Sequence, residues 1–272
     1  MMDPSASRRG VTLADRIRRH PIGLGTAPLG SRADGPLWWG PQDRDDAVAT
    51  VRAAIDAGVA FLDTAPFCGW GRAEEIVGAA IADLDQTPPI LTKYGTVRLA
   101  DGGVGSDASP GAVRRDLEAS LERLGRDRVD ALQVHDPDPA TPIEATWETI
   151  MELVDEGLIG GGGLSNHPIE LMERARRVGP IAVVQHQYSA LHQRAHTDGT
   201  VAWCAEHAVP FLAWAPLASG FLVDDFDLDA LHPDDLRHRL TWANDRGAEV
   251  DEIRRLLAAA AIQSAPSARL RP

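Results

Sequence analysis

The chain has 272 residues, 44% of them hydrophobic and 25% charged, which is the composition of an ordinary globular protein. Its net charge of -13 argues against nucleic acid as a partner, because phosphate binding needs a basic face. There are only two cysteines, Cys68 and Cys204, far apart in the chain, and nothing resembles a disulfide framework or a zinc cluster, so we expect no bound metal. No apolar segment suits a signal peptide or a membrane span, and we therefore expect a cytoplasmic protein without membrane contacts.

Short apolar segments alternate with longer amphipathic stretches along the whole chain. Their length and flanking residues favour buried parallel strands over buried helix. In chain order, we expect strands at Ile22–Gly25, Val59–Leu62, Pro89–Thr92, Val129–Val134, Ile159–Leu164, Ile181–Val184 and Val209–Ala213. Helices between the strands make the sheet parallel, which leaves a closed barrel and an open doubly wound sheet as alternatives.

The stretches between the strands carry helix start and stop signals. Ser109 stands before a proline as the cap of one helix, and Gly125 follows the last apolar residue of that helix. Thr141 and Glu144 have the spacing of a capping box, which predicts the start of the next helix. These signals support the alternation of strands and helices.

Polar or aromatic residues come directly after six of the expected strands. They are Asp63, Lys93, His135, Ser165 with Asn166, Gln185, and Trp214. The ends of many strands converge on one mouth only in a closed barrel. An open sheet usually supplies a glycine-rich phosphate loop, and Gly23–Gly25 lacks the third glycine of that loop. The sequence therefore predicts an α/β barrel.

Six ordered motifs resemble those of the aldo-keto reductases, in particular their bacterial branch. They are Gly23–Gly30 (GLGTAPLG), Ala54–Gly78 (AIDAGVAFLDTAPFCGWGRAEEIVG), Ile90–Gly95 (ILTKYG), Leu132–Pro139 (LQVHDPDP), Gly163–Asn166 (GLSN) and Trp214–Gly220 (WAPLASG). The resemblance implies a (β/α)8 TIM barrel that binds NADP(H) in extended form and reduces carbonyl compounds.

The resemblance also implies a catalytic set of Asp, Tyr, Lys and His. Asp63, Lys93 and His135 match this set, but the tyrosine position, five residues after the aspartate, holds Cys68. The family's phenol donates a proton to the nascent alkoxide, and the lysine lowers the pKa of that phenol. A thiol is a shorter and weaker donor, so we expect impaired or altered redox activity. Two interpretations of Cys68 stay open, an inert buried thiol and a thiolate nucleophile activated by Lys93.

For the cofactor, the resemblance implies binding residues at the strand ends and in the loop after the last strand. These are Thr26, Asp63, Ser165, Asn166, Gln185, Trp214, Leu217, Ser219 and Gly220. Ser165, Asn166 and Gln185 would bind the nicotinamide carboxamide, and Trp214 would stack on the ring. The Leu217–Gly220 loop would cover the pyrophosphate.

After Gly220 the family pattern stops. The remaining sequence predicts a polar loop, a helix at Ala248–Ala261 and a tail, where the family continues with an eighth strand and the loop for the 2′-phosphate. We therefore expect a barrel truncated after the seventh strand, with an N-terminal arm at 1–19, the barrel at 20–261 and an irregular tail at 262–272. NADP(H) binding should then be weak or absent, and the arm or a second subunit should cover the open edge of the barrel.

Three functions remain open from the sequence. The first is an NAD(P)H-dependent carbonyl oxidoreductase acting on a small molecule. The second is a cofactor-independent lyase, dehydratase or cyclase that uses Lys93, His135 and Asp63 for acid–base chemistry. The third is a non-catalytic binding or regulatory protein on a reductase scaffold.

Overall fold

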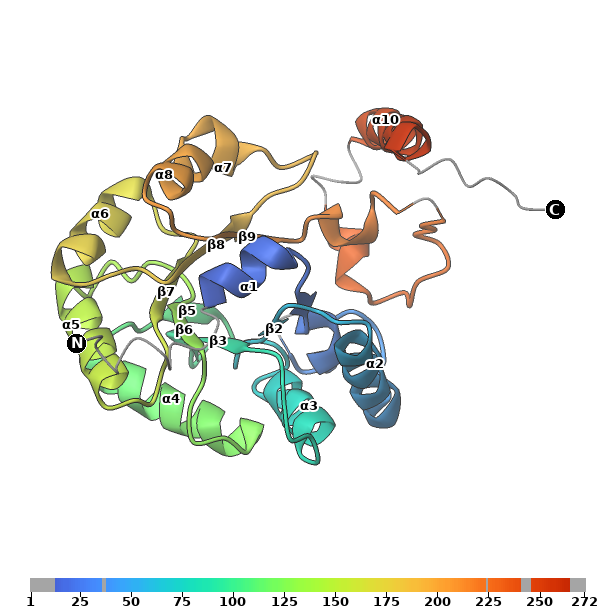
Figure 1. Ribbon diagram of the computed structural model, residues 1–272. Coiled ribbons are helices and arrows are strands. Elements are labelled where there is room, and N and C mark those ends of the chain that lie inside the picture. The colour runs from blue at the N-terminus through green and yellow to red at the C-terminus, as the bar shows by residue number, and fades with distance from the viewer. Residues whose placement is uncertain (1–12, 36–37, 224, 241–245, 265–272) are drawn as a thin grey trace, which may run out of the picture.

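The computed structural model describes residues 13–35, 38–223, 225–240 and 246–264. A curved parallel sheet forms its centre, and helices cover the outside of the sheet (Figure 1). The strands run in the order β1-β2-β3-β6-β7-β8-β9, and each pairs in parallel with its neighbour in that order. Their bounds are β1 Leu24–Gly25, β2 Leu62–Asp63, β3 Ile90–Tyr94, β6 Ala131–Val134, β7 Gly162–Ser165, β8 Val183–Gln187 and β9 Phe211–Trp214.

The barrel predicted from the sequence is confirmed, since all seven expected strands are present in one sheet. Within the described residues, β1 pairs only with β2 and β9 only with β8, so the sheet does not close between β1 and β9. The segment after β9 lies on this open side, where the Leu236 N–H donates to the Trp38 carbonyl at 2.7 Å. The second subunit that we expect over this edge stays a prediction.

The helices are α1 Leu13–Arg19, α2 Arg44–Asp56, α3 Arg72–Ile81, α4 Pro110–Leu124, α5 Ile143–Asp155, α6 Ile169–Val178, α7 Arg194–Thr197, α8 Thr200–Glu206 and α10 Gly247–Ser264. Helices α2 to α8 lie between strands in the chain, whereas α1 precedes β1 and α10 follows β9. Short 3-10 segments occur at η2 Ala27–Gly30, η3 Ala218–Gly220 and η4 Leu236–Arg239. An antiparallel hairpin, β4 Thr96–Arg98 and β5 Val104–Ser106, follows β3.

Alternate residues of each strand face two separate apolar cores. Leu132 and Val134 of β6 pack outward against the helices, in one cluster with Trp147 of α5. Ala131 of the same strand faces the barrel interior. Ile17 of α1 packs on this interior cluster and is 8% exposed, so α1 covers the barrel interior at one end. The segment expected to be an arm therefore contains a helix, while the domain division itself remains a prediction.

Local sequence accounts for where α4 begins and ends. The Ser109 hydroxyl accepts the Ala112 N–H at 3.4 Å, and Gly125 ends the helix at a φ of 63°. A side-chain oxygen in this position satisfies one of the unpaired N–H groups of the first turn. A left-handed φ at the end of a helix favours glycine. Both predicted signals are confirmed.

The predicted capping box before α5 is wrong. The Thr141 hydroxyl donates to Asp138 Oδ2 at 2.6 Å, and Glu144 accepts two bonds of 2.7 Å from Arg174. The helix begins at Ile143, with Pro142 as its cap. The hydrogen bond to an ionised carboxylate is a strong one, and it holds the Thr141 side chain toward Asp138 and away from the N–H groups of the first turn.

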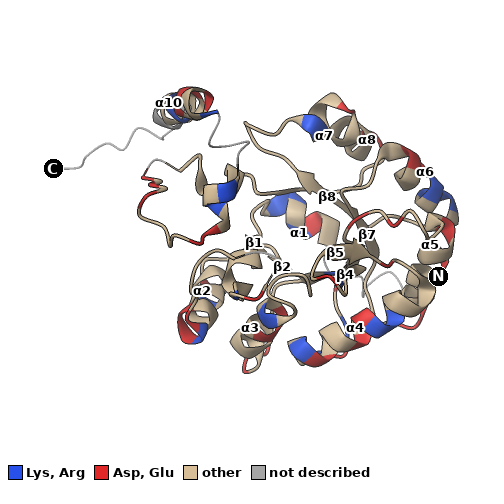
Figure 2. Cartoon of the chain, turned by 180° about the vertical axis from the view of Figure 1, so that it is seen from behind, with Lys and Arg blue, Asp and Glu red and all other residues tan. Residues whose placement is uncertain are grey.

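Charged residues lie mainly on the outer helices (Figure 2); α4 and α6 carry both signs, whereas the charged residues of α5 are all acidic. Arg114 of α4 reaches Glu152 and Glu156 of α5 at 2.8 Å and 2.7 Å. These pairs are exposed and join neighbouring helices around the barrel. No helix in the described part of the chain is long and apolar enough to cross a membrane.

Candidate active site at the carboxyl ends of the strands

Asp63, the last residue of β2, is the centre of a buried polar network. The Lys93 ammonium from β3 lies 2.8 Å from Asp63 Oδ1, and the same ammonium donates to the Thr64 carbonyl at 3.1 Å. The side chains of the pair are only 7% and 14% exposed. Burying two charges is costly unless they are paired and hydrogen-bonded, and here both conditions are met.

Two glutamines complete the hydrogen bonding of the Asp63 carboxylate. Gln133 Nε2 donates to Oδ1 at 3.3 Å, and Gln185 Nε2 donates to Oδ2 at 3.1 Å. The sequence analysis placed Gln185 in the site but missed Gln133. An available signal was the position of Gln133 two residues before His135 in an otherwise apolar strand, which puts both side chains on the same face. Asp63 is thus held from three other strands.

His135 follows β6 and is half-buried beside the network. Its ring meets the Phe67 ring edge-to-face, with 5.5 Å between the ring centroids. Burial, aided by the positive charge of Lys93, lowers the pKa of His135 to about 3. The imidazole is therefore neutral at pH 7, with one ring nitrogen as donor and the other as acceptor.

Cys68 lies in the turn after β2 and is 6% exposed, packed with Ala65 and Ala73. Burial raises the pKa of this thiol to about 12, although the charge of Lys93 acts in the opposite direction. A neutral thiol is a weak hydrogen-bond donor and a poor nucleophile. This environment favours the inert interpretation of Cys68 over the activated thiolate.

Tyr94 does not take the place of the missing phenol. It is 1% exposed and packs in the outer core between β3 and the helices, in the same cluster as Leu117. Burial, together with the carboxylate of Asp116, raises the pKa of Tyr94 well above its ordinary value. Tyr94 is therefore a neutral residue of the outer core.

The structure brings the expected nicotinamide-binding residues together at the ends of β7, β8 and β9. Ser165 is paired with Gln185 in the sheet register. Asn166 has a left-handed φ of 60°, and its amide donates to Asp136 Oδ1 at 2.9 Å. The Asn166 Oδ1 atom accepts the indole N–H of Trp214 at 3.0 Å. The backbone turn after β7 thus points the Asn166 side chain toward the end of β9.

Two observations test whether these residues fit a nicotinamide ring. The Oε1 atom of Gln185 is buried and has no hydrogen-bond partner among the described residues, so an amide N–H of a ligand can pair with it. The Trp214 side chain is a large apolar group that remains 37% exposed, as stacking on a planar ring requires. The buried Gln185 oxygen and the exposed Trp214 ring fit the nicotinamide end of the cofactor.

The remaining predicted cofactor residues lie at both sides of this group. The Thr26 hydroxyl donates to the Asp63 carbonyl at 3.1 Å, which joins β1 to β2. Leu217 is 51% exposed, and Ser219 and Gly220 have φ values of 59° and 97° in the turn after β9. The turn therefore follows Trp214 closely, and its Leu217 side chain is exposed.

Arginines near this turn are engaged with the protein. Arg254 donates to the Phe221 carbonyl at 2.8 Å, and Arg237 is paired with the buried Asp235 at 2.7 Å. Arg246 is bound to Glu249. Three arginines that follow this loop in sequence, Arg237, Arg246 and Arg254, thus already have acidic or carbonyl partners.

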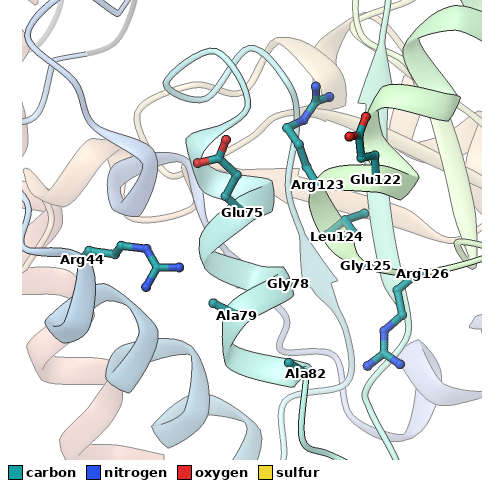
Figure 3. A pocket seen from close by; sticks show the side chains of 10 residues that line it. All are labelled: Arg44, Glu75, Gly78, Ala79, Ala82, Glu122, Arg123, Leu124, Gly125 and Arg126. Atoms are coloured by element: carbon teal, nitrogen blue, oxygen red, sulfur yellow. The ribbon is translucent and has the colours of Figure 1, made fainter.

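A hollow of about 500 Å³ lies away from the strand-end residues, between α2, α3 and α4 (Figure 3). Gly78 of α3 faces the Arg123 carbonyl so closely that a β-carbon would lie 2.5 Å from that oxygen. Arg123 is paired with the buried Glu74 at 2.6 Å, and Arg126 donates to the Ile81 carbonyl at 3.1 Å. These arginines therefore hold the helices together, and none of the strand-end residues lines this hollow.

Comparison with known proteins gives the family of the chain. The model of the aldo/keto reductase family matches residues 21–268. The chain belongs to the aldo/keto reductase family. This aldo/keto reductase is 34% identical over 219 residues to aldo-keto reductase YhdN of Bacillus subtilis (strain 168), a match that covers 80% of the chain and 64% of YhdN. It is 30% identical over 234 residues to the NADH-specific methylglyoxal reductase of Escherichia coli (strain K12), covering 81% and 70% of the two proteins.

Solved structures of other aldo/keto reductases have the same fold. Glycerol dehydrogenase AKR11B4 from Gluconobacter oxydans superposes with a TM-score of 0.75 at 29% identity, covering 88% of this chain and 74% of that one. An aldo-keto reductase from Klebsiella pneumoniae in complex with NADPH superposes with a TM-score of 0.61 at 32% identity, covering 75% and 66%. The chain thus matches less than two thirds of the length of YhdN and of this Klebsiella reductase.

Proposed function

We propose that this aldo/keto reductase is a nicotinamide-dependent carbonyl oxidoreductase that transfers protons slowly. The observation that carries the proposal is the buried Asp63–Lys93 ion pair, 2.8 Å long, with the neutral His135 beside it at the strand ends. In a family of reductases, this arrangement supplies a fixed cation and a fixed hydrogen-bonding ring for a carbonyl oxygen. The substrate is a small carbonyl compound or the corresponding alcohol.

The residues of this chain would act on the carbonyl oxygen. A bound nicotinamide supplies the hydride. His135, neutral at pH 7, orients the carbonyl by donating a hydrogen bond to its oxygen. Lys93 already donates to Asp63 and Thr64, and its third N–H stabilises the negative charge that develops on the same oxygen. Cys68 stays protonated and contributes little as an acid, so the alkoxide would take its proton from solvent, which limits the rate.

The cofactor in this proposal is NADP(H), bound weakly. Gln185, Asn166 and Trp214 offer contacts to the nicotinamide end, and the similar aldo-keto reductase from Klebsiella pneumoniae has a solved structure in complex with NADPH. Arg237 and Arg254, near the turn after β9, are committed to protein partners, so these two arginines offer little to an adenosine 2′-phosphate. Isothermal titration with NADPH and NADH measures this directly, and a low-micromolar Kd for NADPH would contradict it.

The test of the proposed reductase is Cys68→Tyr, with Cys68→Phe as the matched control. Both variants introduce the same ring into the same packing, but only tyrosine has a hydroxyl that can donate a proton. A positioned general acid contributes about a hundred- to ten-thousandfold, so Cys68→Tyr should reduce an activated aromatic aldehyde with NADPH that much faster than Cys68→Phe. A Tyr variant that binds NADPH yet is no faster than the Phe variant would place the defect elsewhere.

A second candidate is a cofactor-independent acid–base enzyme at the same site. It rests on the same cluster of Asp63, Lys93 and His135, although a pKa of about 3 makes the His135 imidazole a weak base at pH 7. Lys93 is less suited to act as a base or a Schiff-base amine, because a carboxylate and a carbonyl hold it as an ammonium. This candidate predicts product formation without any nicotinamide, abolished by Lys93→Met. A reaction that strictly follows NADPH oxidation excludes it.

A further inference from the structure

A small closed hollow lies beside His135 at the end of β3. Its volume is about 10 Å³, and residues that line it include Phe67, Tyr94, Thr96, Asp116 and His135. A cavity of roughly this size holds a single water molecule, provided that it offers polar partners. The edge-to-face contact of Phe67 with the His135 ring gives this side of the imidazole an apolar wall.

Three of the residues that line the hollow have buried polar atoms without a partner among the described residues. They are Nδ1 of His135, Oγ1 of Thr96 and the hydroxyl oxygen of Tyr94. Buried polar atoms in native proteins are almost always hydrogen-bonded to protein or to ordered water, because an unpaired one is costly. Nδ1 of a neutral imidazole and a hydroxyl group are complementary partners for one water.

We propose that one ordered water occupies this hollow, accepts the Thr96 hydroxyl and donates to His135 Nδ1. Thr96 is then a positioning residue that acts on His135 through the water. Since Nδ1 accepts a hydrogen bond, the ring proton resides on Nε2. Which ring nitrogen of a histidine carries the proton is set by the hydrogen bond that the other nitrogen makes.

The tautomer matters for a carbonyl substrate. With the proton on Nε2, this nitrogen donates to the carbonyl oxygen, whereas in the other tautomer Nε2 presents a lone pair that repels it. A neutral ring has this choice, and the low pKa of His135, lowered to about 3 mainly by burial, keeps the ring neutral at pH 7. The effect of the water on rate rests on the proposed reductase function, but its effect on the tautomer does not.

Nitrogen-15 NMR of histidine-labelled protein tests the proposal without cofactor or substrate. The signals of His135 are assigned by their loss in His135→Gln. At pH 7 we expect the wild type and Thr96→Ser to show His135 with its proton on Nε2. Thr96→Val has nearly the same shape but no hydroxyl, and it should shift His135 toward a mixture of the two tautomers. In the cofactor-dependent assay, Thr96→Val should lower kcat, by up to about a hundredfold if the carbonyl is misplaced by about 1 Å, and Thr96→Ser should retain it.

Two results would overturn the proposal. One is a wild-type His135 with its proton on Nδ1, and the other is a Thr96→Val variant whose tautomer equals that of the wild type. If Thr96→Val does not fold, a crystal structure of the wild type decides, because it must show a water within hydrogen-bond distance of both His135 Nδ1 and Thr96 Oγ1. If the tautomer behaves as expected but no variant reduces any carbonyl compound, the water stands and the reductase function fails.

Discussion

Replacing Lys93 by methionine tests the buried ion pair that the candidate site depends on. Methionine fills a similar volume but leaves the Asp63 carboxylate, 14% exposed, with only the amide donors of Gln133 and Gln185. Removing one partner of a buried pair typically costs about 3–5 kcal/mol, because the remaining charge is desolvated and unpaired. Domains of this kind have a total unfolding free energy of only about 5–15 kcal/mol, so the loss should be large.

The assay is urea unfolding at pH 7, followed by tryptophan fluorescence and far-ultraviolet circular dichroism. Coincident transitions from the two probes justify a two-state analysis. The control is Arg114→Met, the same kind of change at an arginine whose pairs with Glu152 and Glu156 are exposed to solvent. Surface pairs are screened and contribute little, so this variant should unfold near the wild-type midpoint.

A double variant separates the unpaired charge from lost packing. Lys93→Met with Asp63→Asn removes both charges and keeps the shape of the pair, so it should regain most of the stability that Lys93→Met loses. The reasoning is refuted if Lys93→Met is no less stable than Arg114→Met. It is also refuted if the double variant is less stable than Lys93→Met, since the carboxylate would then not be the source of the loss.

Three further expectations follow from the same site. Burial raises the pKa of both thiols, Cys68 and Cys204, to about 12, so a disulfide reagent at pH 8 should titrate no thiol in the native protein and two in urea; a rapid native reaction would contradict this. The pKa of His135 lies below its unfolded value, so its contribution to stability is present above about pH 6.5 and is lost as the pH falls toward 3. His135→Gln should therefore lose stability less steeply than the wild type over that range, by up to about 1.4 kcal/mol per pH unit. Equal slopes for the two proteins would disprove this. Gln133→Leu should weaken the Asp63 network and lower the urea midpoint, whereas an unchanged midpoint would show that the 3.3 Å bond adds nothing.

The sequence by itself determined the strands, the barrel and the candidate catalytic residues. Strands that are buried on both faces appear in the sequence as short continuous apolar segments with β-branched residues, so local composition was enough to predict them. The end of α4 was also predictable, because Ser109 and Gly125 act on their own helix. Asp63, Lys93 and His135 were found because residues that directly follow parallel strands of a barrel must meet at one end.

Only the tertiary structure decided properties that depend on distant neighbours. Thr141 turns to Asp138 instead of capping α5, because the carboxylate lies within reach once the loop is folded. Gln133 joins Asp63 across the barrel interior, a contact between residues that lie far apart in sequence. The pKa of about 12 for Cys68 and of about 3 for His135 follow from burial, which exists only when the chain has enclosed these groups and excluded water from them.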